Sequence, residues 1–358
     1  MKTKLWMLGA AVAALTSCTQ SEVVEIPESR VIGFDTYVGK DARAVNTINT
    51  AGLTNFWVYC AKGVGTGVNF VENDEDANTT GTQHFFDAVE VTKNETNYSY
   101  AHKYWVGDKN YRFASYSNSN EVLQSSPTFS ANDNGKWGFT FTEYEVGEKD
   151  LIVALPQEIS VNAEVTDVTH VNLAFYHMLA RVQVIFYIEE LATGQKLQID
   201  PFTIPAVTKG TCTVTTDGTS VEPTIAWTPV TVQDAAYEFN GNETDNSTIV
   251  ESGTEKVLFE CYAIPQANGS LKIPEIEIHT LNANGDVLHT AHYTEVSLAL
   301  TDPNHASWKP GNIYAYQAQI GGDAHQIHFK ATVDNWDDPT GGDKNIGSPS
   351  TAVDNNNP

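Results

Sequence analysis

Residues 171–188 read Val171-Asn-Leu-Ala-Phe-Tyr-His-Met-Leu-Ala-Arg-Val-Gln-Val-Ile-Phe-Tyr-Ile188 and form the strongest apolar segment of the chain. Apolar side chains alternate along it with a period of two, which is typical of β-strands with one buried face. The alternation keeps one phase up to Leu179 and the opposite phase from Val182 onward. A bulge or a short break between them would return the apolar side chains to the core. Because β-branched and aromatic residues dominate, strands are favoured over a helix.

Outward from this segment, strand-like runs separated by turn signals such as Asn282-Ala-Asn-Gly-Asp286 occupy most of the chain, without a long helical period. This spacing predicts all-β sandwiches. Residues 118–134 and the polar residues 337–358 lack such runs, so we expect a loop and a disordered tail there. The expected strands are 31–38, 56–60, 104–106, 111–116, 137–142, 151–155, 197–204, 211–216, 257–264, 271–281, 287–300, 313–320 and 326–333.

The N-terminus has the features of an export signal. Lys2 and Lys4 precede an apolar run, Leu5–Leu15, that is shorter than the roughly 20 residues needed to span a bilayer. The run ends in Leu15-Thr-Ser-Cys18, which resembles a bacterial lipobox. We therefore expect cleavage before Cys18 and acylation of that cysteine, which would tether the protein to a membrane. Ordinary signal cleavage with an unmodified Cys18 is the alternative.

Charge and cysteine content restrict the partners. The chain carries 20 basic and 45 acidic residues, a net charge of −25 that becomes −27 once Lys2 and Lys4 are removed. Such a charge argues against nucleic-acid binding and against protein-surface contact with anionic lipid. Beyond Cys18 there are three cysteines without close spacing, which form no metal motif or disulfide framework. Cys212 and Cys261 could pair, but small buried residues are the favoured interpretation.

No motif for enzyme chemistry is recognisable: there is no nucleophile elbow and no phosphate loop. We therefore expect no catalytic residues, no metal and no cofactor. His177 lies in an apolar strand and is interpreted as a core histidine. His289 and His292 are three residues apart, so within one strand they point to opposite faces. Several aromatic residues either fill the core, which is favoured, or form a sugar-stacking row: Trp57, Tyr59, Tyr104, Trp105 and Tyr116.

Several short pieces together resemble the fimbrillin-like proteins, or type V pilins, of anaerobic Gram-negative bacteria. Each piece alone is weakly specific, but their order and spacing over residues 15–336 are similar to that family. The pieces are the lipobox, Ile32-Gly-Phe34, Arg43-Ala44, Asn55-Phe-Trp-Val-Tyr59, Asp150-Leu-Ile-Val-Ala154, Val171–Val182, Trp308-Lys-Pro-Gly-Asn-Ile-Tyr314 and Val333-Asp-Asn-Trp336.

The resemblance implies two tandem transthyretin-like β-sandwich domains behind a lipoprotein signal peptide. The expected divisions are a signal peptide at 1–17, a tether at 18–30, an N-terminal domain at 31–190, a C-terminal domain at 191–336 and the tail at 337–358.

The resemblance also implies assembly by donor-strand exchange, in which a surface protease cuts after an arginine, the first strand leaves and a strand from another subunit replaces it. Arg43-Ala44 matches the cleavage position, and Arg30 is a competing site that would leave the strand in place. The apolar face of the removable strand is Ile32, Phe34, Thr36 and Val38.

The predicted function is therefore a structural or adhesive pilus subunit at the outer-membrane surface. Its expected partners are other pilin subunits, the membrane through the lipid on Cys18, and a host protein or glycan. An accessory or tip position is favoured over the stalk, because residues 337–358 offer no alternating strand to donate. Residues 325–333 could donate, or could complete their own domain. The alternative is a non-assembling surface lipoprotein that binds glycans.

Overall fold

The computed structural model describes residues 30–38, 52–64, 70, 84–94, 97–118, 123, 125–166, 170–220, 222–232, 235–239, 249–300, 303–321, 326–335 and 351–353. The predicted signal peptide, Cys18 and Arg43-Ala44 lie outside these residues. Among the described residues the secondary structure is β throughout, apart from short 3₁₀ turns, which confirms the all-β prediction. No helix in the described part of the chain is long and apolar enough to cross a membrane.

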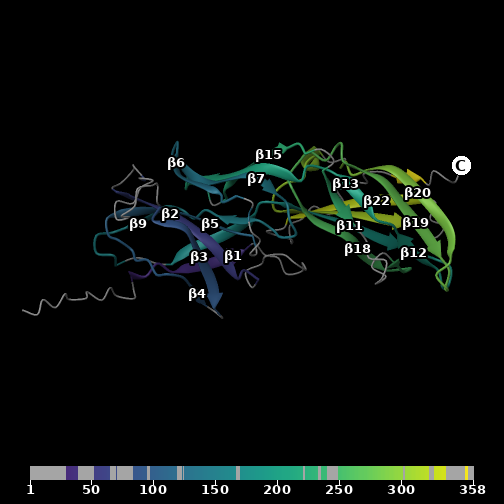
Figure 1. Ribbon diagram of the computed structural model, residues 1–358, viewed down its shortest axis with the longest axis horizontal. Helices are drawn as coiled ribbons and strands as arrows, with labels where there is room; N and C mark the ends of the chain where they lie inside the picture. Colours follow the sequence, from purple (N-terminus) through teal and green to yellow (C-terminus); the bar gives the residue numbers. More distant parts are fainter. Residues whose placement is uncertain are drawn as a thin grey trace, which may run out of the picture.

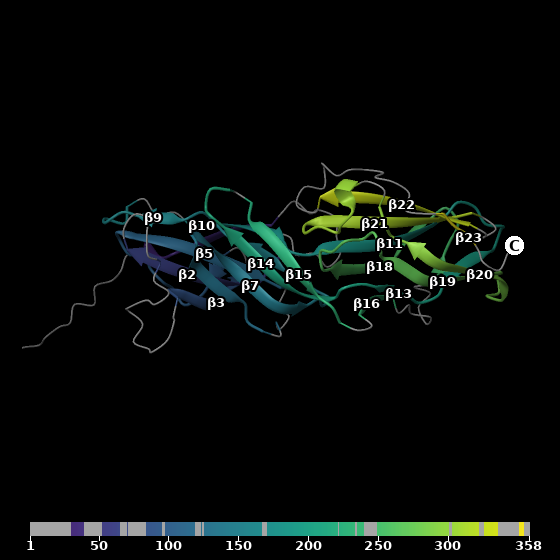
Figure 2. The ribbon, with the colours of Figure 1, turned by 90° about the horizontal axis from the view of Figure 1, so that it is seen from above.

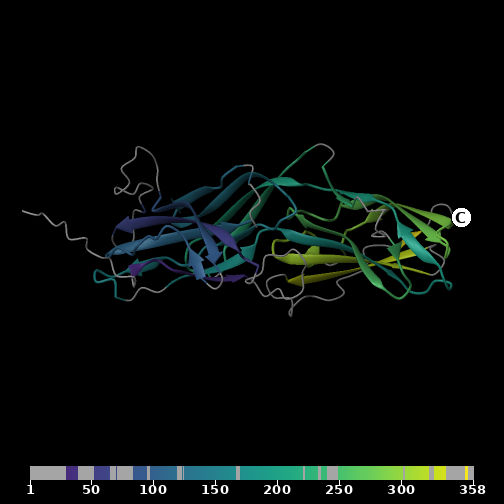
Figure 3. The same cartoon turned by 60° about the horizontal axis from the view of Figure 1, so that its bottom comes forward.

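The molecule is elongated, with the strands up to residue 177 at one end and most of the strands from residue 180 onward at the other (Figure 1). The strands at residues 209–216 and 224–230 are the exception, because they join a sheet at the N-terminal end. The same arrangement is seen from above (Figure 2) and from below (Figure 3). The tandem count of transthyretin-like domains and their division at residues 190/191 stay predictions. Strands on the two sides of residue 190 pair with each other, because β14 (Lys209–Thr216) is hydrogen-bonded to β7 (Lys136–Glu145).

The N-terminal end contains an eight-stranded sheet in the order β1-β10-β8-β5-β2-β3-β4, with β9 paired to β5. One apolar core lies where Ile32, Phe34 and Val38 meet the β2 residues Phe56 and Val58. The strands are β1 (Phe34–Val38), β2 (Asn55–Val64), β3 (Phe86–Asn94), β4 (Asn97–Ser99), β5 (Lys109–Ser117), β8 (Ile152–Ala154), β9 (Ile159–Val161) and β10 (Val171–His177).

A four-stranded sheet in the order β15-β14-β7-β6 covers the opposite face of β2 and β5. Its core joins Tyr59 and Tyr116 to Phe139, Phe141 and Cys212. β2 is therefore buried on both faces, which explains why its apolar and aromatic residues do not alternate with polar ones. The strands are β6 (Thr128–Asp133), β7 (Lys136–Glu145), β14 (Lys209–Thr216) and β15 (Thr224–Val230).

The C-terminal end has sheets in the orders β18-β11-β21-β22-β23, β17-β12-β19-β20 and β13-β16 around a third core. The strands are β11 (Ala180–Ile188), β12 (Lys196–Ile199), β13 (Phe202–Pro205), β16 (Ala236–Phe239), β17 (Ile249–Val250), β18 (Glu255–Ala263), β19 (Lys272–Leu281), β20 (Val287–Ser297), β21 (Asn312–Ile320), β22 (Gln326–Asn335) and β23 (Thr351–Val353).

The phase slip predicted in residues 171–188 is confirmed as a break between β10 and β11. Met178 and Leu179 form the break, and the Met178 amide donates to the carbonyl of Leu151 at 2.8 Å. The two strands join different sheets and different cores. The change of phase thus directs each half of the segment into its own core.

Four expectations from the sequence differ from the structure. The expected strand 104–106 is only an isolated bridge, because Tyr104 alone pairs with Val31. Residues 128–133 of the expected loop form β6, because Phe129 and Ala131 reach the core that Trp137 and Phe139 also line. The expected strand 197–204 is interrupted at Asp200-Pro201, since proline cannot donate to a sheet ladder. Within the segment expected to be disordered, the short apolar stretch at 351–353 forms β23 on β22.

Gly138 lies where β7 passes very close to β14. A Cβ at this position would be 1.9 Å from the carbonyl oxygen of Val214 and 2.9 Å from the Cα of Thr215. We expect Gly138→Ala to lower the free energy of unfolding by about 3 kcal/mol, because the backbone of β14 must move. Gly135→Ala, in the adjacent turn with no atom within 4 Å, should cost only about 1 kcal/mol of backbone strain. Urea unfolding of both variants tests this, and equal losses would contradict it.

Candidate functional site

The first strand occupies the end of the eight-stranded sheet. β1 runs parallel to β10, with Phe34 opposite Val171 and Val38 opposite Phe175. In the described residues it has no strand partner along Phe34–Val38 on its other side. An end strand joined to the sheet by one ladder is the element that leaves with the loss of the fewest backbone hydrogen bonds.

The residues leading into β1 are held by a second segment. The amide of Ile32 donates to the carbonyl of Lys103 at 3.0 Å, and the amide of Trp105 donates to the carbonyl of Arg30 at 2.9 Å. The Tyr100 hydroxyl donates to the carbonyl of Ile32 at 2.6 Å. Burial raises the pKa of Tyr100 to about 12, and the hydroxyl is protonated at neutral pH with or without this shift. The backbone of residues 30–32 is therefore fixed in place.

The side chains of this strand confirm the predicted alternation. Ile32, Phe34 and Val38 are buried, while Asp35 and Tyr37 are exposed. Thr36, which lies on the inner face, is half-buried and shares a hydrogen bond of 2.7 Å with the Tyr98 hydroxyl. The Phe34 ring meets four aromatic rings at centroid distances of 5.5–6.2 Å, which belong to Phe56, Phe86, Tyr100 and Phe113. β1 therefore fills an aromatic groove.

The aromatic residues considered for sugar stacking are mainly core residues. Tyr59, Trp105 and Tyr116 are buried, and Trp57 stacks on Tyr116 with ring centroids 5.3 Å apart. Core filling, the favoured interpretation, is confirmed for these residues.

The segment considered as a donor strand lies inside the C-terminal half. β22 pairs along its length with β21 and at Gln326–His328 with β23. Ala331 and Val333 are buried in the core of that half. In this structure, residues 326–335 therefore belong to a sheet of the C-terminal half, as the second of the two interpretations drawn from the sequence requires.

Cys212 and Cys261, the pair considered from the sequence, do not form a disulfide. Cys212 is fully buried between β14 and its neighbours, and burial raises its pKa well above the usual value. A thiol held in its neutral form is a poor nucleophile, so Cys212 acts as a small core residue.

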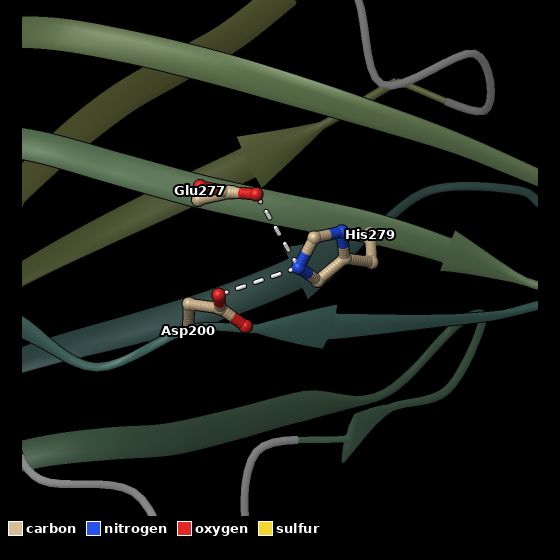
Figure 4. A group of neighbouring side chains, drawn as sticks. All are labelled: Asp200, Glu277 and His279. Atoms are coloured by element: carbon tan, nitrogen blue, oxygen red, sulfur yellow. Dashed lines mark hydrogen bonds and ion pairs between the residues drawn. The ribbon is translucent and has the colours of Figure 1, made fainter. Parts of the chain in front are cut away.

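A second group of polar residues was not anticipated from the sequence. Asp200, Glu277 and His279 converge on the C-terminal sheet, where Nε2 of His279 lies 3.3 Å from Oδ2 of Asp200 and 3.5 Å from Oε1 of Glu277 (Figure 4). The histidine pair considered in the sequence, His289 and His292, lies within one strand, whereas this group crosses strands. The alternation Glu275-x-Glu277-x-His279, which puts three such groups on one face, is the signal that could have found it.

Comparison with protein families matches residues 42–336 to the family described as fimbrillin-like, and the chain belongs to this family. A search of curated proteins gave no match. Among solved structures, a fimbrial protein from Bacteroides vulgatus is 19% identical, with a TM-score of 0.55 over 86% of this chain and 99% of that one. A fimbrial assembly protein from Parabacteroides distasonis is 14% identical, with a TM-score of 0.37 over 89% and 98% of the two chains. The fimbrial anchor protein Mfa2 from Porphyromonas gingivalis is 8% identical, with a TM-score of 0.33 over 89% and 99%.

Family membership has consequences for function. The fimbrillin-like family is a family of structural fimbrial proteins rather than of enzymes. Membership implies a cell-surface location and interaction with other pilin subunits. The likeness to the Bacteroides vulgatus protein shows a shared fold.

Proposed function

We propose that this chain is an exported subunit of a surface pilus that assembles by donor-strand exchange. In this proposal it crosses to the outer membrane as a lipoprotein anchored through Cys18. A protease then cuts between Arg43 and Ala44, and β1 leaves the sheet. A strand from another subunit fills the groove that β1 occupied.

The observation that carries the proposal is the position of β1 in its sheet. This strand lies at the end of its sheet, and its inner side chains fill an aromatic groove beside β10. Its removal would expose both a ladder of backbone groups on β10 and an apolar surface, which together form a template for β-augmentation. The donor strand would need large apolar side chains at the positions of Ile32, Phe34 and Val38.

The hydrogen bonds around Arg30 favour Arg43 over Arg30 as the proposed cleavage site. The carbonyl of Arg30 accepts the amide of Trp105 at 2.9 Å, and the next residues are bound to Lys103 and Tyr100. Proteases need a locally unfolded, extended substrate, so a hydrogen-bonded backbone resists cleavage. A cut after Arg43 would also free the whole of β1, whereas a cut after Arg30 would retain it.

An accessory or tip position fits the C-terminal half better than a stalk position. β22 is held by β21 and β23, and the residues of β22 that reach the core stabilise their own half. Donation of this strand would break its own sheet. The chain is therefore proposed to accept a strand rather than to donate β22. Its proposed adhesive partner is a host protein or a glycan.

Arg43→Ala is expected to abolish maturation at residue 44. N-terminal sequencing and intact mass of the surface protein should give Ala44 as the first residue of the unmodified chain. The variant should begin at acylated Cys18 and lose SDS-resistant, high-mass assemblies. Arg30→Ala is the matched control and should mature normally. A start at Cys18 in all three proteins would contradict the proposal and favour the alternative, a fixed surface lipoprotein that binds glycans.

A further inference from the structure

We propose that Asp200, Glu277 and His279 form a binding site for one divalent transition-metal ion of the zinc class. The site lies in the C-terminal half, away from the β1 groove, and is independent of strand exchange. Its residues come from two strands of one sheet: Glu277 and His279 from β19, and Asp200 from the residue that follows β12.

The fold brings these three side chains to one face. Glu277 and His279 are two residues apart in β19 and therefore point the same way. β12 runs antiparallel to β19, with Gln198 opposite His279, and the amide of Asp200 donates to the carbonyl of Glu277 at 3.0 Å. The side chain of Asp200 thereby reaches the imidazole from the neighbouring strand (Figure 4).

The spacing of the ligand atoms suits a tetrahedral ion. Nε2 of His279 lies 3.3 Å from Oδ2 of Asp200 and 3.5 Å from Oε1 of Glu277. All three ligand atoms lie within 4.8 Å of one another. Zinc bonds to nitrogen and oxygen are about 2.0–2.1 Å long, so neighbouring ligands of a tetrahedral ion are about 3.3–3.4 Å apart. Three protein ligands leave the fourth position for water.

The imidazole is oriented as a metal ligand would be. Nδ1 of His279 lies 2.8 Å from Oγ1 of Thr290, which is opposite it on β20. When Nδ1 carries the proton and donates to this hydroxyl, Nε2 presents its lone pair between the two carboxylates. Such a hydrogen bond from the second nitrogen is the usual means of fixing a histidine ligand.

The carboxylate of Glu277 contacts a second histidine, His292. Nδ1 of His292, on β20, lies 3.5 Å from Oε2 of Glu277 and 3.4 Å from Oε1 of Glu275. Glu277 therefore turns one oxygen toward His279 and the other toward His292. With neutral imidazoles the carboxylates of Asp200 and Glu277 supply two negative charges, which a divalent cation neutralises. The nitrogen ligand disfavours Ca²⁺ and Mg²⁺, which prefer oxygen.

Metal binding can be measured on the full chain, purified without a histidine tag and freed of metal with a chelator that is then removed. Isothermal titration with Zn²⁺ should show binding that His279→Gln and Asp200→Asn each weaken at least tenfold. Thr290→Val should weaken it less while keeping the fold. His170→Ala is the matched control, since His170 pairs with a single carboxylate, Asp35, at 3.0 Å. Its affinity for Zn²⁺ should equal that of the wild type.

Two further readouts separate a metal site from an ion pair of protonated His279 with the carboxylates. Co²⁺ should give the intense visible absorption of a tetrahedral ion in the wild type and lose it in His279→Gln. Zn²⁺ at about 100 times its Kd should raise the Tm by roughly 5 °C, and Mg²⁺ should not. A Kd for Zn²⁺ weaker than about 1 mM would overturn the proposal. Equal affinity in His279→Gln, or equal binding of Ca²⁺, would overturn it as well.

Discussion

Phe34→Ala is expected to lower the free energy of unfolding of the uncut chain by about 3–5 kcal/mol. The ring is 6% exposed and lies within aromatic contact distance of Phe56, Phe86, Tyr100 and Phe113. Its truncation removes buried apolar area and leaves a cavity that four rigid rings cannot close. The loss should be large because β1 is joined to its sheet by a single ladder and depends on side-chain packing.

Urea unfolding of the uncut chain measures this loss, and Tyr37→Ala is the matched control. Tyr37 lies on the same strand, but its side chain is 44% exposed and faces away from the groove. We expect its removal to change stability by less than about 0.5 kcal/mol. A loss below about 1 kcal/mol for Phe34→Ala would show that the groove can collapse without the strand.

The same variant also tests what happens after maturation. If cleavage after Arg43 removes β1, then assemblies of the mature protein no longer contain residue 34. Their SDS resistance should then be equal in Phe34→Ala and wild type, although less of the uncut variant reaches the surface. Weaker assemblies built from the variant would indicate that β1 is retained.

The strands of this fold could largely be predicted from the sequence, because alternation is a local property. Residues 171–188 show this best, since their change of phase predicted the break between β10 and β11. β6 was missed because polar residues surround Phe129, and its apolar contacts come from β7 and from Tyr59 on β2. Which strands pair is a long-range property, so the parallel ladder between β1 and β10 was not visible in either strand alone.

Of the two candidate sites, the inner face of β1 could be predicted from the sequence and the group at His279 could not. The inner face of β1 was predictable because Ile32, Phe34 and Val38 alternate along one short run. The group at His279 was not predicted, because Asp200 is far from it in sequence and only the register of β12 on β19 brings them together.

His177→Ala is expected to destabilise the chain by about 3–5 kcal/mol, because it would leave a carboxyl group buried without its partner. Nδ1 of His177 is hydrogen-bonded to Oδ2 of Asp150 at 2.5 Å, and both side chains are fully buried. The core position predicted for His177 is thereby confirmed. This contact joins the residues just before β8 to the end of β10, and both belong to segments through which the sequence resembles the fimbrillin-like family.

A double-mutant cycle with Asp150→Ala, followed by urea unfolding, measures the coupling directly. The sum of the two single losses should exceed the loss of the double variant by a coupling energy of about 0.5–3 kcal/mol, since removing both partners leaves neither side chain buried without the other. The chain supplies its own control in His170 and Asp35, which make the same kind of pair at 3.0 Å with both side chains mainly exposed. His170→Ala should cost less than about 1 kcal/mol, because water replaces the lost partner. Similar losses for His170→Ala and His177→Ala would mean that burial of the pair contributes nothing. A much larger loss for His177→Ala would show that the buried pair stabilises the chain at the end of β10, the strand against which β1 lies.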